Sequence, residues 1–471
     1  SEFVMRLPSL SRLIVLTCLL LCSGISSAAQ GSIDNDIRLL IKAHGLTGDP
    51  ASGTPVPSIN APKSQLGMKL FYSRSLGGDE TTACVTCHHP MLGGGDDLSL
   101  PIGVDSIEPE VLGPNRRINA KHAVKVPRNA PTTFNIALWK KHMFHDGRIK
   151  KLDEYSIQTP DVGEGKADAL GGDNLVQAQA RFPTTSNEEM RGTFMSAAMS
   201  QTVRRSLANR LKKNWESEFR VAFNDRSSPL DDLITEQNIS EAIADYERSQ
   251  LFVKNPWSDY IAGNKQAISD QAKRGAALFF KTQDQGGAAC ASCHSGDFFT
   301  NEEFYNTAMP QIGEGKPLHA GDTSHDDQGC FIISGKEDDR YRFRTPSLLN
   351  VEVTGPWGHN GAYTSLEAVT AHMLNPQKAL KQYDPKQLQQ TGIRQKSLER
   401  SRQGSLKAGI DIKPVNNSSK QDIDDLVAFM KTLTDPCVKS RQCLSPWIPD
   451  HNSNDPDGNM LHGLRKAGQR L

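Results

Sequence analysis

The pattern Cys-x-x-Cys-His occurs twice in this chain, at residues 84–88 and 290–294. Two thiols at this spacing can each bond one vinyl group of a haem, and the adjacent histidine then lies under the ring as an iron ligand. A disulfide or half of a zinc site would also use the cysteine pair, but a zinc ribbon does not require histidine after each pair. We therefore predict two covalently bound haem c groups. The predicted attachment residues are Cys84, Cys87, Cys290 and Cys293, and the predicted iron ligands are His88 and His294.

The first 29 residues have the pattern of a secretory signal. Residues 1–4 are interpreted as a cloning remnant; a basic start, an apolar run at 13–21 and small residues ending at Ala29 follow. The run is too short to cross a bilayer and no other stretch approaches about 18 apolar residues, so we predict no integral membrane span. Export predicts the periplasm, where c-type haem is attached. Lipoprotein processing at Cys22 is disfavoured because a bulky leucine precedes it.

The charge balance excludes one class of partner. Lys+Arg and Asp+Glu are both 54, so the formal net charge is zero. Nucleic-acid-binding proteins normally carry a basic excess, and we therefore predict no nucleic-acid partner. The length of 471 residues alone would favour about three domains.

Repeated segments around the cysteine motifs lower that number to two. Gly-Met-Lys-Leu-Phe-Tyr at 67–72 precedes the first motif, and Gly-Ala-Ala-Leu-Phe-Phe at 275–280 precedes the second. Each has the pattern of an amphipathic helix end. Downstream, Arg, Pro, Asn and His recur with nearly equal spacing over 128–145 and 344–359. We predict a mainly α fold of two cytochrome c-like haem domains related by internal duplication.

Three cysteines remain outside the signal and the two motifs: Cys330, Cys437 and Cys443. The last two are separated by five residues and can form a disulfide in an oxidising compartment. Cys330 is then left over, either buried or paired differently.

Four further motifs make the chain similar to a known family. They are Pro-Arg-Asn-Ala-Pro-Thr at 127–132, Phe-His-Asp-Gly-Arg at 144–148, Asn-Glu-Glu-Met at 187–190 and Gly-Pro-Trp-Gly-His-Asn-Gly at 355–361. Together with the two haem motifs they resemble the bacterial di-haem cytochrome c peroxidase/MauG family over roughly 60 to 435. The run at 293–300 is more similar to the MauG-type branch. The resemblance implies hydrogen peroxide as the oxidant and a calcium ion between the domains.

The resemblance implies different roles for the two haems. Met373 matches the distal methionine of haem 2, which would make that haem the electron-accepting centre. The equivalent position in the first domain is Thr159, a poor iron ligand, so haem 1 is predicted to be peroxidatic. His372 competes with Met373 for the ligand role. His122 lies near the position where some family members carry a distal histidine on haem 1, and a surface histidine is the alternative.

Three residues are predicted to be catalytic. Glu189 matches the family's glutamate, which would take a proton from bound peroxide and return it to the leaving oxygen. His145 stands where the family has a tryptophan between the haems, so Trp139 or Trp357 could supply another electron route. Tyr155 stands where a glutamine is common in the haem 1 pocket.

The resemblance also implies positions for calcium and for haem propionates. Asn129, with carbonyl groups near Arg344 and Pro346, is the carried-over calcium site, for which a structural turn is the alternative. Arg128 and Arg344 are predicted to contact haem propionates, because a guanidinium pairs well with a carboxylate.

The predicted organisation has five segments. They are residues 1–29 (cloning remnant and signal peptide), 30–60 (N-terminal linker), 61–255 (N-terminal peroxidatic haem domain, here the first half), 256–435 (C-terminal electron-transfer haem domain, here the second half) and 436–471 (C-terminal tail). Residues 30–60 and those after 446 are rich in Pro, Asn and Asp, and we expect them to be loosely ordered. Apolar spacing predicts helices over 239–253, ended by Asn255-Pro256, and over 422–434.

The sequence leads to three hypotheses about function. The first is peroxide reduction with electrons from a small cytochrome c or cupredoxin. The second is a MauG-like oxidation of tryptophan or tyrosine in a partner protein. The third is a di-haem electron carrier without enzymatic activity, which Glu189 and the contrast between Thr159 and Met373 disfavour. A homodimer is left open.

Overall fold

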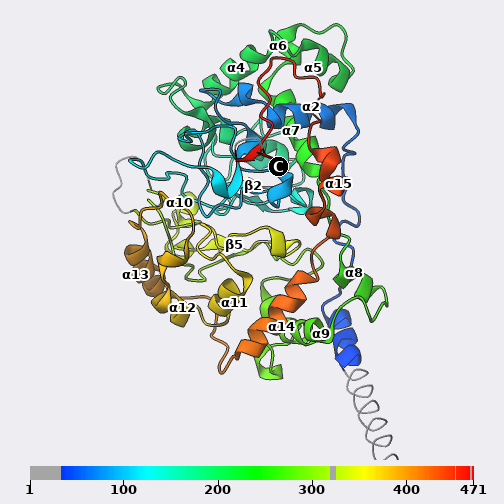
Figure 1. The fold of residues 1–471 in the computed structure, drawn as a ribbon, viewed down its shortest axis with the longest axis vertical. Coiled ribbons are helices and arrows are strands. Elements are labelled where there is room, and N and C mark those ends of the chain that lie inside the picture. Colours follow the sequence, from blue (N-terminus) through cyan, green and yellow to red (C-terminus); the bar gives the residue numbers. More distant parts are fainter. Residues whose placement is uncertain (1–32, 319–324, 451, 467–468) are drawn as a thin grey trace, which may run out of the picture.

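Two lobes lie one above the other along the long axis of the molecule (Figure 1). The computed structural model describes residues 33–318, 325–450, 452–466 and 469–471. The upper lobe is formed mainly by the first half and the lower lobe by the second half. The helices of the first half are α2 (Pro62–Tyr72), α3 (Leu175–Ala180), α4 (Ser200–Leu211), α5 (Glu216–Phe223), α6 (Leu230–Leu233) and α7 (Glu236–Arg248). The later helices are α8 (Pro256–Ile261), α9 (Asp270–Phe280), α10 (Phe331–Ser334), α11 (Leu366–Leu374), α12 (Pro376–Gln382), α13 (Leu398–Ala408), α14 (Lys420–Lys431) and α15 (Arg441–Leu444).

Strands in the described residues are short and local. They are β1 (His142–Met143), β2 (Ile149–Lys151), β3 (Ile157–Gln158), β4 (Phe304–Tyr305), β5 (Phe343–Arg344), β6 (Leu464–Lys466) and β7 (Gln469–Arg470). The first three form an antiparallel sheet in the order β1-β2-β3, and β4–β5 and β6–β7 are antiparallel pairs. The prediction of a mainly α fold is therefore confirmed.

One pair of helices forms the core of each lobe, and the two pairs cross in the same way, each at a glycine. At Gly67 in α2, an added Cβ would overlap the Ala242 carbonyl oxygen of α7 and lie 2.9 Å from the Tyr246 Cβ. At Gly275 in α9, an added Cβ would overlap the Asp425 carbonyl oxygen of α14 and lie 2.8 Å from a phenylalanine Cβ. Each glycine thus lets two helix backbones approach more closely than any side chain would permit. The repeated segments end where α2 and α9 end, as predicted.

Two asparagine turns join the lobes. Asn135 and Asn350 both have a left-handed backbone, with φ of 59° and 61°, which asparagine tolerates better than most residues. Their side-chain amides donate to the same carbonyl, that of Phe252, over 3.0 and 2.9 Å. The Phe252 N–H donates back to Asn135 Oδ1 over 2.7 Å. The segment that connects the halves is therefore held by the same kind of turn from each side.

The segment that connects the halves differs from the helix predicted over 239–253. Helix α7 begins early because the Thr235 side chain accepts from the Asn238 N–H, and it ends at Arg248 rather than at 253. Residues after α7 leave the helix and bond to the asparagine turns. Asn255 does not end α7; its side chain accepts from the Ser258 N–H and caps α8.

Each end of the described chain packs on the lobe formed by the opposite half. Residues 33–43 are helical and pack on the lower lobe, where Ile37 is fully buried. The C-terminal tail returns to the upper lobe, where Leu461 is fully buried. The expectation of loose order is wrong for these parts of 30–60 and of the tail, because their few apolar side chains lie at positions that the local composition does not reveal. The predicted signal, residues 1–29, lies outside the described residues.

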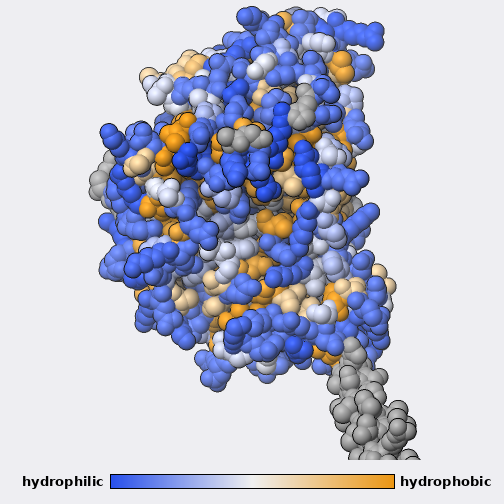
Figure 2. Space-filling model, in the orientation of Figure 1, coloured by the Kyte–Doolittle hydropathy of each residue, from blue (hydrophilic) through white to orange (hydrophobic). Residues whose placement is uncertain are grey.

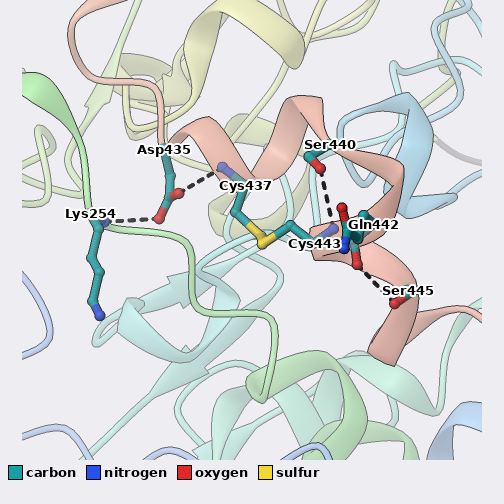
Figure 3. The surroundings of a disulfide bond; sticks show 7 residues. All are labelled: Lys254, Asp435, Cys437, Ser440, Gln442, Cys443 and Ser445. Atoms are coloured by element: carbon teal, nitrogen blue, oxygen red, sulfur yellow. Dashed lines mark hydrogen bonds between the residues drawn. A yellow bond between two sulfur atoms is a disulfide. The ribbon is translucent and has the colours of Figure 1, made fainter.

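The tail begins with a small loop closed by the disulfide between Cys437 and Cys443, a pairing that the sequence allowed (Figure 3). Asp435 precedes it and accepts from the backbone N–H groups of Lys254 and Cys437, each over 2.9 Å. One carboxylate therefore fixes the start of the tail to the segment that connects the halves. Cys330 is unpaired with another cysteine and half-buried.

No helix in the described part of the chain combines the length and the apolar character needed to cross a membrane. The face in Figure 2 is mostly hydrophilic, with its hydrophobic residues in separate small groups.

The close helix crossings can be tested with Gly275→Ala. Alanine favours a helix over glycine by about 1 kcal/mol, but its Cβ would overlap the Asp425 carbonyl. We expect a net loss of about 1–3 kcal/mol in the free energy of unfolding, as for other overpacked cores, measured by chemical denaturation. Gly163→Ala, where the nearest atoms are 3.7 Å away on a lysine side chain, is the control. Unchanged stability of Gly275→Ala would contradict the crossing.

Candidate active site

The first cysteine motif folds as a short turn that presents its histidine. Cys84 and Cys87 flank the 3-10 turn η2 (Cys84–Thr86), and His88 follows. His88 Nδ1 lies 3.1 Å from the Gly94 carbonyl oxygen, and partial burial lowers the pKa of the ring while the carbonyls of Gly94 and Pro131 oppose that shift. A neutral ring that donates from Nδ1 keeps Nε2 free to bind a metal.

The second motif repeats this arrangement. Cys290 opens the 3-10 turn η9 (Cys290–Ser292), and His294 Nδ1 lies 3.1 Å from the carbonyl oxygens of both Phe299 and Pro346. Burial again lowers the pKa of the ring. Burial also raises the pKa of the cysteine thiols, that of Cys290 to about 12. The residues of both motifs therefore fit a covalently attached haem with histidine ligation.

The candidate distal ligands differ in what they already bind. Met373 lies on α11 and is half-buried. His372 beside it is fully buried, with Nδ1 2.8 Å from the Tyr363 hydroxyl and Nε2 2.9 Å from the Thr307 carbonyl oxygen. Both of its ring nitrogens are occupied, so His372 is not free to compete with Met373. In the first half the Thr159 hydroxyl donates to Asp168.

Glu189 lies in a tight π-helical turn, η7 (Asn187–Arg191). Single π turns of this kind are frequent at functional sites. Burial raises the pKa of the Glu189 carboxyl, and the positive charges of Arg148 and Lys316 partly oppose the shift. The carboxyl is thus placed to exchange a proton nearer neutral pH than a surface glutamate.

Arg148 and Lys316 belong to a buried charge cluster between the halves. Arg128 donates to Asp327 through two nitrogens, over 2.6 and 2.9 Å, and to Asp146 over 2.5 Å. Asp146 also lies 3.2 Å from Arg148 and 3.3 Å from Lys316. Burial opposes ionisation of both carboxyls, but the neighbouring cations outweigh it and hold the pKa of Asp327 at about 2. The first and second halves each contribute one aspartate to Arg128.

Comparisons with known proteins agree with this geometry. Residues 61–266 match the family model described as di-haem cytochrome c peroxidase. Residues 61–266 belong to the di-haem cytochrome c peroxidase family. The chain is 26% identical over 415 residues to the methylamine utilization protein MauG of Methylorubrum extorquens, covering 88% of this chain and 89% of that protein. It is 27% identical over 368 residues to the cytochrome c551 peroxidase of Pseudomonas aeruginosa, covering 78% and 86%.

Solved structures show the same fold. The crystal structure of a MauG-like protein associated with microbial copper homeostasis aligns with a TM-score of 0.56 at 22% identity, covering 83% of this chain and 96% of that one. The diheme peroxidase BthA from Burkholderia thailandensis aligns with a TM-score of 0.53 at 18% identity, covering 82% and 89%. The mainly α, MauG-like diheme peroxidase fold therefore extends beyond the matched residues.

A second set of family positions links the halves through their backbones. The Asn129 N–H donates to the His359 carbonyl and the Arg344 N–H donates to the His145 carbonyl, each over 2.9 Å. His145 Nε2 lies 3.1 Å from the Asn129 carbonyl oxygen, and burial lowers the pKa of this histidine to about 4. The Asn129 amide donates to the Leu98 carbonyl over 2.9 Å. Burial and the nearby Arg128 charge favour a neutral His145 ring at the junction, and the bond to the Asn129 carbonyl opposes that shift.

The two arginines of this region differ in their partners. The Arg128 guanidinium donates to two aspartates through three of its five N–H groups, and its contact with a propionate stays a prediction. Arg344 lies over the Trp139 ring at 3.4 Å and donates to the His142 carbonyl over 2.5 Å. Its buried Nε has no hydrogen-bond partner among the described residues, so a propionate contact stays a prediction for Arg344.

The calcium prediction is not tested by side-chain geometry. Among the described residues, no group of three or more His, Cys, Asp or Glu side chains is arranged to hold a metal ion. A calcium site at Asn129 would therefore depend on carbonyl and amide oxygens, as the family resemblance implies.

Two predicted site residues lie in solvent. His122 is exposed in a turn, where its N–H donates to the Asn119 carbonyl over 2.8 Å. Tyr155 is 85% exposed between β2 and β3. The structure does not bring either side chain to Glu189, because the local turns direct them outward. Conversely, sequence reasoning missed Asp146 and Arg148, although both lie in the 144–148 motif, and Lys316, for which no sequence signal was present.

The influence of the cluster on Glu189 can be measured with Lys316→Gln. Because the ammonium group lowers the pKa of Glu189, its removal should raise that pKa further. The measurement is an infrared titration of the buried carboxyl band, assigned by its loss in Glu189→Gln. Exposed Lys166→Gln is the control. An unchanged or lowered Glu189 pKa in Lys316→Gln would refute the coupling.

Proposed function

We propose that this protein is a periplasmic di-haem c-type peroxidase that reduces hydrogen peroxide to water with electrons from a small redox protein. The observation that carries the proposal is the contrast between the halves. Met373 is available as a second iron ligand in the second half, whereas Thr159 in the first half is bonded to Asp168. Glu189, whose pKa is raised by burial, belongs to the first half. One half is thus suited to electron transfer and the other to peroxide.

Each haem c, when bound, would supply a redox-active iron. Its ring would be attached through the two cysteines of one motif. His88 and His294 would ligate the irons from the proximal side, and the carbonyls at their Nδ1 atoms would fix the orientation of the rings. Glu189 would accept a proton from one peroxide oxygen and return it to the leaving oxygen. The overall reaction consumes two protons and two electrons for each peroxide and yields two waters.

The repeated contacts support an internal duplication. Gly67 and Gly275 occupy equivalent helix crossings, Asn135 and Asn350 occupy equivalent turns, and both proximal histidines donate to two carbonyls. We infer that residues 61–255 and 256–435 are two cytochrome c-like haem domains derived from one ancestral unit. A calcium ion near Asn129 remains part of the proposal.

A MauG-like oxidation of a partner protein is the second candidate. One observation favours it: Trp139 lies between the halves, with its ring 5.1 Å from Phe298 of the second motif loop and with Arg344 stacked on it. An oxidisable ring at this junction could take over the role of the missing tryptophan at His145. Adding peroxide with reduced cytochrome c, or with a candidate partner protein, separates the two functions by which one is oxidised.

Glu189→Gln tests the peroxidase proposal. Losing the ionisable carboxyl should lower peroxide turnover by about 100-fold or more, in the range of general acid–base catalysis, with both haems retained. Because burial raises the pKa of Glu189, wild-type kcat/KM should fall as pH drops through that raised pKa. The neighbouring exposed Glu188→Gln is the control. Wild-type turnover in Glu189→Gln would remove this residue from the mechanism.

Met373→Ala tests the division of work between the haems. If Met373 ligates the second haem, its loss should convert that haem from low spin to high spin in the absorption and electron paramagnetic resonance spectra. Met309→Ala in the same half is the control. A low-spin second haem that persists in Met373→Ala would show that another residue is the ligand.

A further inference from the structure

Two backbone segments contact the turn that carries Glu189. Segment 102–104 lies against η7, where the Val104 N–H points to the Glu188 carbonyl over 3.4 Å. Segment 77–79 also lies against η7, where the Gly78 N–H donates to the Met190 carbonyl over 2.7 Å. Both segments come from distant parts of the first half.

A glycine makes each approach possible. An added Cβ at Gly103 would overlap the Glu188 carbonyl oxygen and lie 2.5 Å from that of Glu189. An added Cβ at Gly78 would overlap the Arg191 carbonyl oxygen and lie 2.6 Å from the Phe194 Cβ. Neither glycine has a positive φ, so space and not backbone conformation requires glycine at both positions.

An arginine holds each segment, and the one that holds 102–104 is buried. Arg116 is 3% exposed and donates to the carbonyls of Ile102 over 2.6 Å and Gly103 over 2.8 Å. Its remaining bonds go to the carbonyls of Pro109 and Val111. All four of these bonds end on backbone oxygens, and Arg116 forms no ion pair with a carboxylate of the described residues.

The second arginine holds the other segment in a similar way. Arg210 on α4 donates to the carbonyls of Ser75 over 3.1 Å, Gly77 over 2.7 Å and Gly78 over 3.0 Å. Its ion pair with Glu80 is long, at 3.8 Å. The guanidinium of Arg210, like that of Arg116, therefore mainly holds a loop in place through its carbonyl groups.

We propose that Arg116 and Arg210 are positioning residues that clamp the Glu189 turn through these two segments and thereby fix where its carboxyl meets peroxide. The inference rests on the proposed function of Glu189. A buried guanidinium without a close carboxylate is costly, and burial lowers the pKa of Arg116 to about 10. A lysine could not replace it, because an ammonium cannot bond four carbonyls in one plane.

A purely structural role predicts something different. If Arg116 only stabilised its loop, removing it would lower the free energy of unfolding and leave the properties of Glu189 unchanged. If it positions the turn, the carboxyl should become misplaced and better hydrated. Hydration removes part of the burial effect, so the pKa of Glu189 would fall toward its ordinary value.

The experiment compares Arg116→Met, Arg116→Lys and the control Arg117→Met in the haem-loaded protein. Arg117 is the exposed neighbour, paired with Glu108 over 2.8 Å. Both Arg116 variants should lose about 10- to 100-fold in kcat/KM for peroxide, the scale of a small misplacement. Their acid limb and the Glu189 infrared band should move to lower pH, while the haem spectra stay unchanged. Wild-type values in both Arg116 variants would overturn the proposal.

Gly103→Ala keeps the test decisive if the Arg116 variants fail to fold. It leaves every arginine in place and displaces only the carbonyls of Glu188 and Glu189, so the same kinetic loss is expected, with Gly163→Ala as the control. Glu189→Gln separates the two proposals. If Glu189→Gln turns over normally, the proposed function fails. If Glu189→Gln is slow but Gly103→Ala and Arg116→Lys are normal, only the clamp fails.

Discussion

The buried pairing of Arg128 with Asp146 and Asp327 is the interaction on which the junction depends. Each aspartate comes from a different half, and all three side chains are almost fully buried. Removing one partner of such a group leaves an uncompensated charge, which is far more costly than losing a surface ion pair. The cluster therefore fixes how the halves meet, and through Arg148 and Lys316 it also sets the electrostatic surroundings of Glu189.

Backbone contacts extend this junction along the whole interface. The paired bonds from Asn129 to His359 and from Arg344 to His145 cross between the halves in both directions. The asparagine turns converge on Phe252, and Asp435 ties the start of the tail to the same segment. The terminal segments then pack on opposite lobes, so a movement between the lobes would have to disturb buried side chains at both ends.

The glycines explain why the fold tolerates such close packing. At Gly67 and Gly275 the absence of a Cβ lets helix backbones touch, and at Gly78 and Gly103 it lets loops touch the Glu189 turn. Both glycines of the first pair begin a repeated segment of the sequence, so the repetition marked their positions but did not indicate the close crossings. Nothing in the local sequence predicted the second pair, since their partners are distant in the chain.

The amino-acid sequence by itself determined the haem-attachment motifs, the mainly α character and the repeated helix ends, because these depend on short-range spacing. It allowed a disulfide between Cys437 and Cys443 but left the pairing open, and the structure supplied it. The sequence also located Glu189 and Met373 through the family motifs. Only the tertiary structure decided that His372 is already bonded, that Arg128 serves two aspartates, and that Tyr155 and His122 face solvent. It alone brought Lys316 and Arg116 into the surroundings of the Glu189 turn. The physical reason is that a side chain's partners and its exposure to water depend on contacts between distant segments, which local spacing does not specify.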